Sequence, residues 1–219
     1  MKKTLKITFL TAVAIMMLIY LTCDIFSIWD SRPLKFAGSA LIALFGLNAL
    51  KSKESRFVSF GLMFTLIADV FLVLLDKYLY GVFVFILAQL CYTVYLTYLS
   101  GKKVHIELLK RILPALAVVI TTSLLSFKGN IILPAAYAVC IGVNIAHSVE
   151  LQVLKPSKKH LILMIGFIVF VIGDICVGLR HMPFVTSEAA KILYLITWIS
   201  YPPSQIMLLS STGALKEKD

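Results

Sequence analysis

The sequence predicts an all-α membrane protein, a polytopic bundle of eight transmembrane helices. Of its 219 residues, 60% are hydrophobic and only 15% are charged, and the mean hydropathy of +0.94 lies far above that of a soluble globular domain. The apolar residues form long runs that lack the alternation of barrel strands. Because backbone groups in lipid must be hydrogen-bonded within their own segment, these runs are predicted to be helices.

Eight apolar runs of sufficient length follow one another along the chain. A hydrocarbon core of about 30 Å needs about 20 residues of helix, with a lower bound of about 17. The stretches between the runs are too short for a further domain, so residues 1–219 are expected to form one integral membrane domain. The runs lie near 5–22, 34–50, 58–75, 80–99, 111–127, 131–149, 161–179 and 192–211.

The basic residues predict the orientation of the bundle. The chain has 21 Lys and Arg residues and a net charge of +10, but these residues fall in short loops between apolar runs. They are therefore topology signals, and we exclude nucleic acid as a partner. Eight helices place six of the 21 basic residues on one side and the rest on the side of the two termini, so both termini are expected to be cytoplasmic. The six are Arg32, Lys35, Lys77, Lys128, Arg180 and Lys191.

Two apolar runs carry an acid in the middle of the same residue frame. Asp69 follows Gly61 by eight residues, and Asp174 follows Gly166 by eight; a leucine comes five residues after each acid. The two helices are four apart in the order of the chain, so they run in the same direction. The frame suggests two parallel four-helix repeats, about 1–100 and 101–219, as in some transporter folds.

The depth of these two acids makes them candidate functional residues. At 1.5 Å per residue, Asp69 and Asp174 lie roughly 16–20 Å from the cytoplasmic ends of their helices, near the bilayer midplane. A charged side chain there costs at least about 2.5–3.5 kcal/mol, so an intramembrane acid is by default a functional-site hypothesis. The alternative is a structural acid paired with a buried donor.

Polar side chains on three other helices share faces at helical spacing and predict a polar pocket inside the bundle. In the last helix a Pro202-Pro203 pair frees backbone carbonyls and predicts a kink. The alternative for the amide side chains is hydrogen bonding between helices without a role in a site. The candidate binding residues are Gln89, Tyr92, Tyr137, Asn144, Tyr201 and Gln205.

The sequence gives no sign of a metal or another cofactor. The cysteines lie in or beside apolar runs and show neither metal-ligand spacing nor a secreted disulfide framework. Two aspartates with a glutamine are a poor ligand set for zinc. We therefore expect no metal site and no cofactor. The four cysteines are Cys23, Cys91, Cys140 and Cys176.

Short motifs in an ordered set over nearly the whole chain resemble those of the YhhN family of eight-helix membrane proteins, whose characterised members are lysoplasmalogenases. Three positions depart from the family pattern: Gln89 stands where the family usually has His, Ala68 where it has Gly, and Gly173 where it has Ser. The matching residues are Gly61-Leu62, Ala68-Asp69 and Leu72, Ala88-Gln89 and Tyr92, Ala136-Tyr137, Gly166, Phe170, Gly173-Asp174, Tyr201 and Ser204-Gln205.

The resemblance implies a hydrolase of lipid metabolism in the plasma membrane, the inner membrane of a bacterium. Its substrate would be a lysophospholipid-like membrane lipid, a lysoplasmalogen, whose vinyl ether bond is cleaved to a fatty aldehyde and glycerophospho-ethanolamine or -choline. This chemistry needs one protonated carboxyl group and one carboxylate, a division of labour known from glycosidases. Asp69 and Asp174 are expected to be catalytic and to share one proton, and the six polar residues to position water or substrate.

Two other classes of function fit the same features. Parallel repeats, midplane acids and a broken last helix also describe a proton-coupled transporter of lipids or small molecules. A non-catalytic lipid-binding protein derived from an enzyme fold is the other class, and the glutamine at position 89 favours it, because glutamine cannot exchange protons near neutral pH as histidine does.

Overall fold

A computed structural model describes residues 3–125, 129–182 and 184–215, with no account of the side chains of residues 129 and 130. The described residues form eight α-helices, as predicted, and contain no strand. Two short helical segments of other types extend α2 and α3: the 3-10 helix Leu47–Lys51 and the π-helix Val70–Leu74. The α-helices are α1 Lys3–Phe26, α2 Arg32–Gly46, α3 Arg56–Asp69, α4 Tyr78–Ser100, α5 Val104–Leu124, α6 Gly129–Leu154, α7 Lys158–Arg180 and α8 Ser187–Ser211.

Seven of the eight helices are long and apolar enough to cross a membrane. The exception is α5, because Glu107, Lys110 and Arg111 all lie in its first half. The last residues of the predicted run 111–127 lie outside the described residues, and so does Lys128. The all-helical membrane fold is confirmed, whereas the orientation of the termini and the two-repeat organisation stay predictions.

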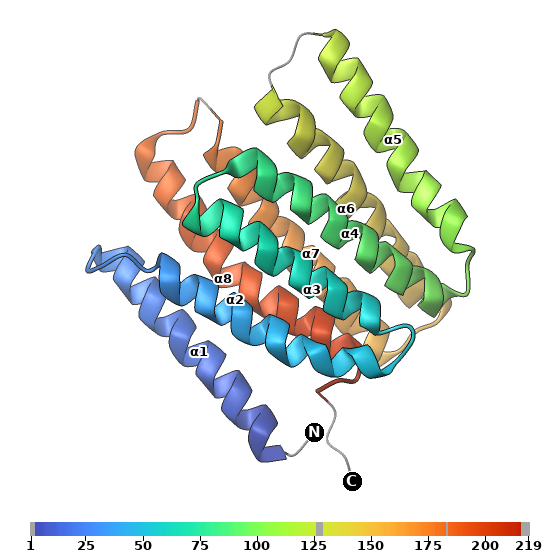
Figure 1. The fold of residues 1–219 in the computed structure, drawn as a ribbon, viewed down its shortest axis with the longest axis horizontal. Coiled ribbons are helices and arrows are strands. Elements are labelled where there is room, and N and C mark those ends of the chain that lie inside the picture. The colour runs from blue at the N-terminus through green and yellow to red at the C-terminus, as the bar shows by residue number, and fades with distance from the viewer. Residues whose placement is uncertain (1–2, 126–128, 183, 216–219) are drawn as a thin grey trace.

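The helices lie side by side as a bundle with α1 and α5 at opposite edges (Figure 1). The N- and C-terminal segments lie at one end of the bundle, which we call the terminal end. The turns α1–α2, α3–α4 and α7–α8 lie at the opposite end, which we call the far end. Among the described helices the closest neighbours are α7 with α8 and α3 with α4.

Two of the basic residues counted as loop residues are inside the bundle, which corrects the charge count. The Lys35 side chain is buried and its Nζ lies 2.5 Å from Asp24 Oδ2 and 3.9 Å from the centre of the Tyr194 ring. Arg111 on α5 is also fully buried and pairs with Glu107 at 3.0 Å. A buried charge needs such partners, which is why both side chains turn away from the loops.

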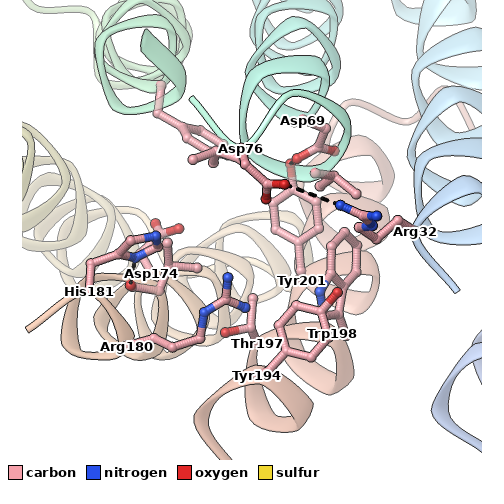
Figure 2. A pocket seen from close by; sticks show the side chains of 14 residues that line it. Arg32, Asp69, Asp76, Asp174, Arg180, His181, Tyr194, Thr197, Trp198 and Tyr201 are labelled. Atoms are coloured by element: carbon pink, nitrogen blue, oxygen red, sulfur yellow. Dashed lines mark hydrogen bonds and ion pairs between the residues drawn. The ribbon is translucent and has the colours of Figure 1, made fainter. Parts of the chain in front are cut away.

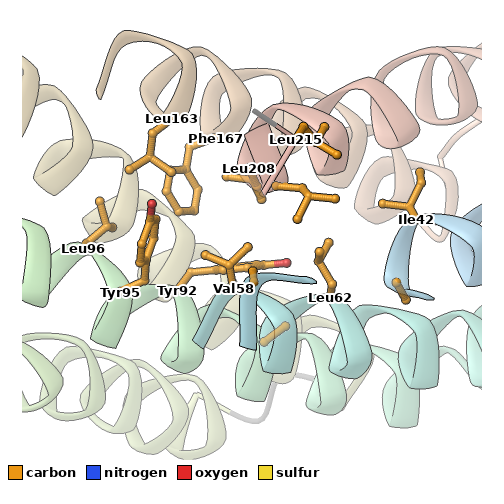
Figure 3. Close-up of a cluster of buried hydrophobic side chains, with 14 of the residues drawn as sticks. Ile42, Val58, Leu62, Tyr92, Tyr95, Leu96, Leu163, Phe167, Leu208 and Leu215 are labelled. Carbon is orange, nitrogen blue, oxygen red and sulfur yellow. The ribbon is translucent and has the colours of Figure 1, made fainter. Parts of the chain in front are cut away.

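Apolar packing fills the half of the bundle near the terminal end (Figure 3). Two glycines of the repeated frame allow close approach there. Gly61 lies against the ring of Tyr92 on α4, and a Cβ at Gly166 would lie 3.1 Å from Met207 Cβ on α8. Small residues at helix interfaces are the usual means of close packing in membranes. These contacts bring α3 against α4 and α7 against α8, eight residues before each of the two acids.

The α-helical geometry of α3 ends at Asp69. The following residues form a π-helix, in which Leu75 N donates to Val70 O at 3.0 Å. The π-helix ends at Leu74, and two residues later the φ of Asp76, 51°, lies in the left-handed region. By contrast, α7 continues as a regular α-helix through Asp174 to Arg180. Short π segments inside helices often occur at functional sites.

Candidate active site

Asp69 and Asp174 line one cavity, which lies between α3, α7 and α8 toward the far end (Figure 2). Its volume is about 120 Å³. Asp69 enters from the end of α3, Asp174 from the second half of α7, and Tyr201 from α8. The prediction that Asp69 and Asp174 lie close to a common pocket is therefore consistent with the structure, which brings Tyr201 to the same place.

Asp69 is almost completely buried, with 2% of its surface exposed. Its Oδ1 accepts a hydrogen bond of 2.9 Å from the Tyr201 hydroxyl. Its Oδ2 is also buried but has no hydrogen-bond partner among the described residues. Tyr201 is itself fixed by packing, since its ring is stacked on Phe170 at 5.7 Å and meets Trp198 edge-on at 5.6 Å.

Asp174 is partly exposed, and its environment differs from that of Asp69. Its Oδ2 accepts a short hydrogen bond from the Tyr137 hydroxyl of α6. That hydroxyl in turn accepts a bond of 3.2 Å from Gln89 Nε2 on α4. Each acid is thus bound to a tyrosine of its own, and no hydrogen bond joins the two carboxyl groups. The expectation that the two acids share one proton stays a prediction.

The other predicted binding residues lie behind the cavity or away from it. Gln89 and Asn144 are fully buried and bound to each other, with Asn144 Nδ2 2.9 Å from Gln89 Oε1. Tyr92 lies in the apolar core beside Gly61, and its hydroxyl has no partner among the described residues. Gln205 is buried on α8 with its Nε2 unpartnered in the described chain. None of these four side chains lines the cavity.

Charged residues at the far end form the mouth of the cavity, and the sequence interpretation did not assign them to the site. Arg32 is bound to Asp30 at 2.9 Å and to Asp76 at 3.2 Å. Arg180 lies over the ring of Tyr194 at 4.6 Å and points into the cavity (Figure 2). Among the described acids none forms an ion pair with Arg180. Its position directly after an apolar run was the one available signal, and it is equally typical of an interfacial cap.

His181 completes this rim. Its ring is stacked on that of Tyr78 with 3.8 Å between the centroids, and Nδ1 lies 2.8 Å from Val177 O. Loss of solvent around the ring lowers the pKa of His181 below its usual value. The imidazole is therefore mostly neutral at neutral pH, and it adds a polar group rather than a second fixed charge beside Arg180.

A second cavity of about 150 Å³ adjoins the first between α4, α6 and α7. Its walls are almost entirely apolar and include Val82, Phe85 and Pro134. Asp174 lines both cavities, as do Leu72 and Val177. The arrangement places one carboxyl group at the junction of an apolar compartment and a compartment with a charged mouth.

The described residues contain no group of three His, Cys, Asp or Glu side chains that could hold a metal ion. No curated protein and no solved structure matches the chain. The sequence pattern of one protein family does match, over residues 31–212, a range that contains both acids, both tyrosines and all residues of the cavity mouth. The chain therefore belongs to the YhhN family.

Proposed function

We propose that this membrane protein is a hydrolase that cleaves the vinyl ether bond of lysoplasmalogens. The products are a fatty aldehyde and glycerophospho-ethanolamine or -choline. The observation that carries the proposal is the pair of carboxyl groups, Asp69 and Asp174, on one cavity in the interior of a membrane bundle. Membership of the YhhN family agrees with a hydrolase of this kind.

The chemistry needs two acids in different protonation states. A protonated carboxyl group delivers a proton to the alkene carbon that is not bonded to oxygen, which leaves an oxocarbenium ion on the ether side. A carboxylate stabilises that cation and orients a water molecule, as in glycosidases. Water adds to the carbon bonded to oxygen and returns a proton to the site. The hemiacetal then collapses, and the glycerol oxygen leaves with a proton, so the reaction consumes one water.

The two cavities suggest how the lipid lies. The apolar compartment beside Phe85 and Pro134 suits the hydrocarbon chain, and the mouth suits the headgroup. Arg180 has no acidic partner in the described chain, so its guanidinium is available to a phosphate, for which it has the right fork geometry. The bond to be cleaved then lies beside Asp174, where the two compartments meet.

The assay that tests the proposal measures aldehyde release from lysoplasmenyl lipid by the purified protein. An alkyl ether analogue with a saturated bond should not react, because it has no alkene carbon to protonate. Asp69→Asn and Asp174→Asn should each lower the rate of release by at least about 10²-fold, while the purified variants keep the elution profile and helix content of the wild type. Asp30→Asn is the matched control, since Asp30 is exposed at the same end and lies outside the cavity.

Other outcomes would assign the protein to a different class. Substrate-dependent flux in liposomes without bond cleavage would identify a transporter. Saturable binding of lysolipid without turnover would identify a binding protein. Full aldehyde release by either aspartate variant would contradict the catalytic roles of Asp69 and Asp174.

A further inference from the structure

A chain of hydrogen-bonded side chains links Asp174 to a buried arginine on the outermost helix. From Asp174 it passes through Tyr137 and Gln89 to Asn144, and Asn144 Oδ1 accepts a bond of 2.9 Å from Arg111 Nε. Gln89, Asn144 and Arg111 have no exposed surface. We call this set of five residues the polar chain. It connects α7, α6, α4 and α5, and buried polar groups that are fully bonded hold one arrangement of a core.

The direction of every bond in the polar chain is fixed by its chemistry. Arg111 can only donate, so the Asn144 atom that faces it must be the amide oxygen. The Asn144 amide nitrogen then faces Gln89, and it also donates to the Gln89 backbone carbonyl at 2.9 Å, a group that can only accept.

The next two bonds follow from the first two. Gln89 presents Oε1 to Asn144, so its Nε2 must face Tyr137. The Tyr137 oxygen accepts that bond, and its single proton is left to donate to Asp174. The polar chain therefore runs from a permanent cation to a carboxylate, with each group donating to the next. A hydrogen bond to an ionised carboxylate is stronger than one to a neutral carboxyl group. The hydroxyl of Tyr137 at the end of the series therefore favours the carboxylate form of Asp174.

The environment of Asp69 has no such series of donors. Its hydrogen bond comes from Tyr201, whose hydroxyl accepts no bond from another described donor and is therefore free to act in either direction. Asp69 Oδ2 is buried and accepts no hydrogen bond of normal geometry from the described residues, and the Ser39 hydroxyl that lies beside Asp69 is a neutral group. Of the two mouth arginines, Arg32 is already bound to Asp30 and Asp76, and among the described residues neither Arg32 nor Arg180 forms an ion pair with Asp69. Burial of a carboxyl group that has no charged donor costs less free energy in its neutral form than in its ionised form.

We infer that the polar chain holds Asp174 as the carboxylate and leaves Asp69 as the protonated acid, with Gln89, Asn144 and Arg111 as positioning residues. The protonation states depend only on the bonding described above. The assignment of Asp69 as the group that protonates the alkene carbon also rests on the proposed function. Gln89 then acts through the fixed orientation of its amide, which delivers a donor to Tyr137 and needs no proton exchange of its own.

Infrared spectroscopy of the substrate-free protein in lipid at neutral pH tests this assignment. Aspartate labelled with ¹³C marks the carbonyl stretch of any protonated aspartic acid and separates it from glutamic acid. We expect one buried protonated aspartic acid in the wild type. Its band should be absent from Asp69→Asn and present in Asp174→Asn.

Variants of the polar chain test the positioning role. Gln89→Glu keeps the shape of the side chain but replaces the donor with an acceptor, so Tyr137 can turn its proton away from Asp174. Tyr137→Phe removes that donor altogether. Either variant should add a second band of protonated aspartic acid. Thr97→Val is the matched control, because Thr97 is buried further along α4 and, among the described residues, its hydroxyl bonds only to Thr93 O. It should keep the wild-type spectrum.

The spectra decide the inference without any assay of activity. A band that disappears in Asp174→Asn, or a wild type with two bands or none, would overturn it. A wild-type spectrum in both folded variants of the polar chain would also overturn it. If Gln89→Glu does not fold, Tyr137→Phe alone provides this test. The expected spectra from a protein that releases no aldehyde would refute the proposed hydrolysis and leave the assignment of the two acids standing.

Discussion

The two acid-bearing helices have the same sequence frame and place their acids in two different environments. In both, a glycine eight residues earlier lies at a close helix contact. Yet Asp69 lies where α3 turns into a π-helix and has one tyrosine as its bonded partner, whereas Asp174 lies in a regular helix and receives a chain of donors. The shared frame gives each acid the same place relative to a close helix contact, and the neighbouring helices give it different bonding partners.

The difference arises from which helices are adjacent. The tyrosine that binds Asp69 is on α8, between the packed rings of Phe170 and Trp198. The tyrosine that binds Asp174 is on α6, which also carries Asn144 and packs against both α4 and α5. Only the second arrangement reaches a buried cation, so the two acids should respond differently to the same kind of mutation.

The largest expected effect is on turnover. Asp69→Asn removes the proton donor and should lower the rate of aldehyde release by about 10²–10⁴-fold, the usual contribution of a general acid. Asp174→Asn removes one group that stabilises a developing charge and should cost about 10²–10³-fold. Steady-state kinetics on both variants measure the two losses. A larger loss in Asp174→Asn would reverse the comparison.

The two tyrosines should contribute unequally to stability. Tyr137→Phe removes the acceptor of the Gln89 amide and the hydroxyl that donates to the Asp174 carboxylate. Because one of these bonds goes to a charged group, the variant should lower the free energy of unfolding by about 1.5–3 kcal/mol. Tyr201→Phe removes one bond to a neutral carboxyl group and should cost about 0.5–1.5 kcal/mol. Thermal unfolding in detergent compares them. Equal losses would show that the donors behind Tyr137 add nothing.

The two frame glycines should also differ, by a smaller amount. A Cβ at Gly61 would overlap the buried ring of Tyr92, whereas a Cβ at Gly166 would meet Met207 Cβ at 3.1 Å. Overpacking costs about 1–3 kcal/mol, and alanine recovers up to about 1 kcal/mol through its helix propensity. Gly61→Ala should therefore be destabilising and Gly166→Ala close to neutral in the same unfolding assay.

Gly142→Ala is the control for this pair, because no neighbouring atom lies within 4 Å of a Cβ at that position. It should be neutral or slightly stabilising. If Gly61→Ala were as stable as this control, Tyr92 would have room to move and the close contact of α3 with α4 would not be tight.

The smallest effect concerns the remote end of the polar chain and depends on pH. Burial raises the pKa of Glu107, but hydrogen bonds from Lys110 and Arg111 outweigh it and lower the pKa to about 2. A depressed pKa means that the stabilisation is present above the unfolded-state value of about 4.5 and is lost as pH falls toward 2. The melting-temperature advantage of wild type over Glu107→Gln should therefore shrink across that range. An advantage independent of pH would mean that Glu107 does not hold Arg111 through its charge.

Hydropathy predicted the number and approximate bounds of the helices, because the cost of exposing backbone in lipid leaves little choice. It did not predict that the fifth helix begins at Val104, which places Glu107, Lys110 and Arg111 inside it, or that Lys35 and Arg111 are buried. Both side chains were assigned to loops by their charge. Lys35 is paired with Asp24 of another helix, and Arg111 binds the α6 amide of Asn144 in addition to Glu107 one turn away on α5. No local pattern predicts the two contacts between helices.

The helical rise led us to expect the two acids deep inside the bundle, and both line one cavity there. Their bonding partners were not predictable, because α4 and α6 are apolar nearly all round and periodicity does not fix their rotation. Gln89 and Asn144 were expected at the pocket, yet they lie one layer behind it with Tyr137 in between. The mouth residues Arg32 and Arg180 come together only through the meeting of three turns at the far end.

The burial of Arg111 has a consequence for how the protein is made. Its helix, α5, has just two buried residues among those that the structure describes in it, and both are charged. Left alone in the bilayer, an arginine at membrane depth costs about 2.5–3.5 kcal/mol or more. The shelter comes from Asn144 and His147, which are synthesised after α5. Glu107 on the same helix can pair with Arg111 from the start, but we expect α5 to reach its final place in the bundle only after α6 has been synthesised.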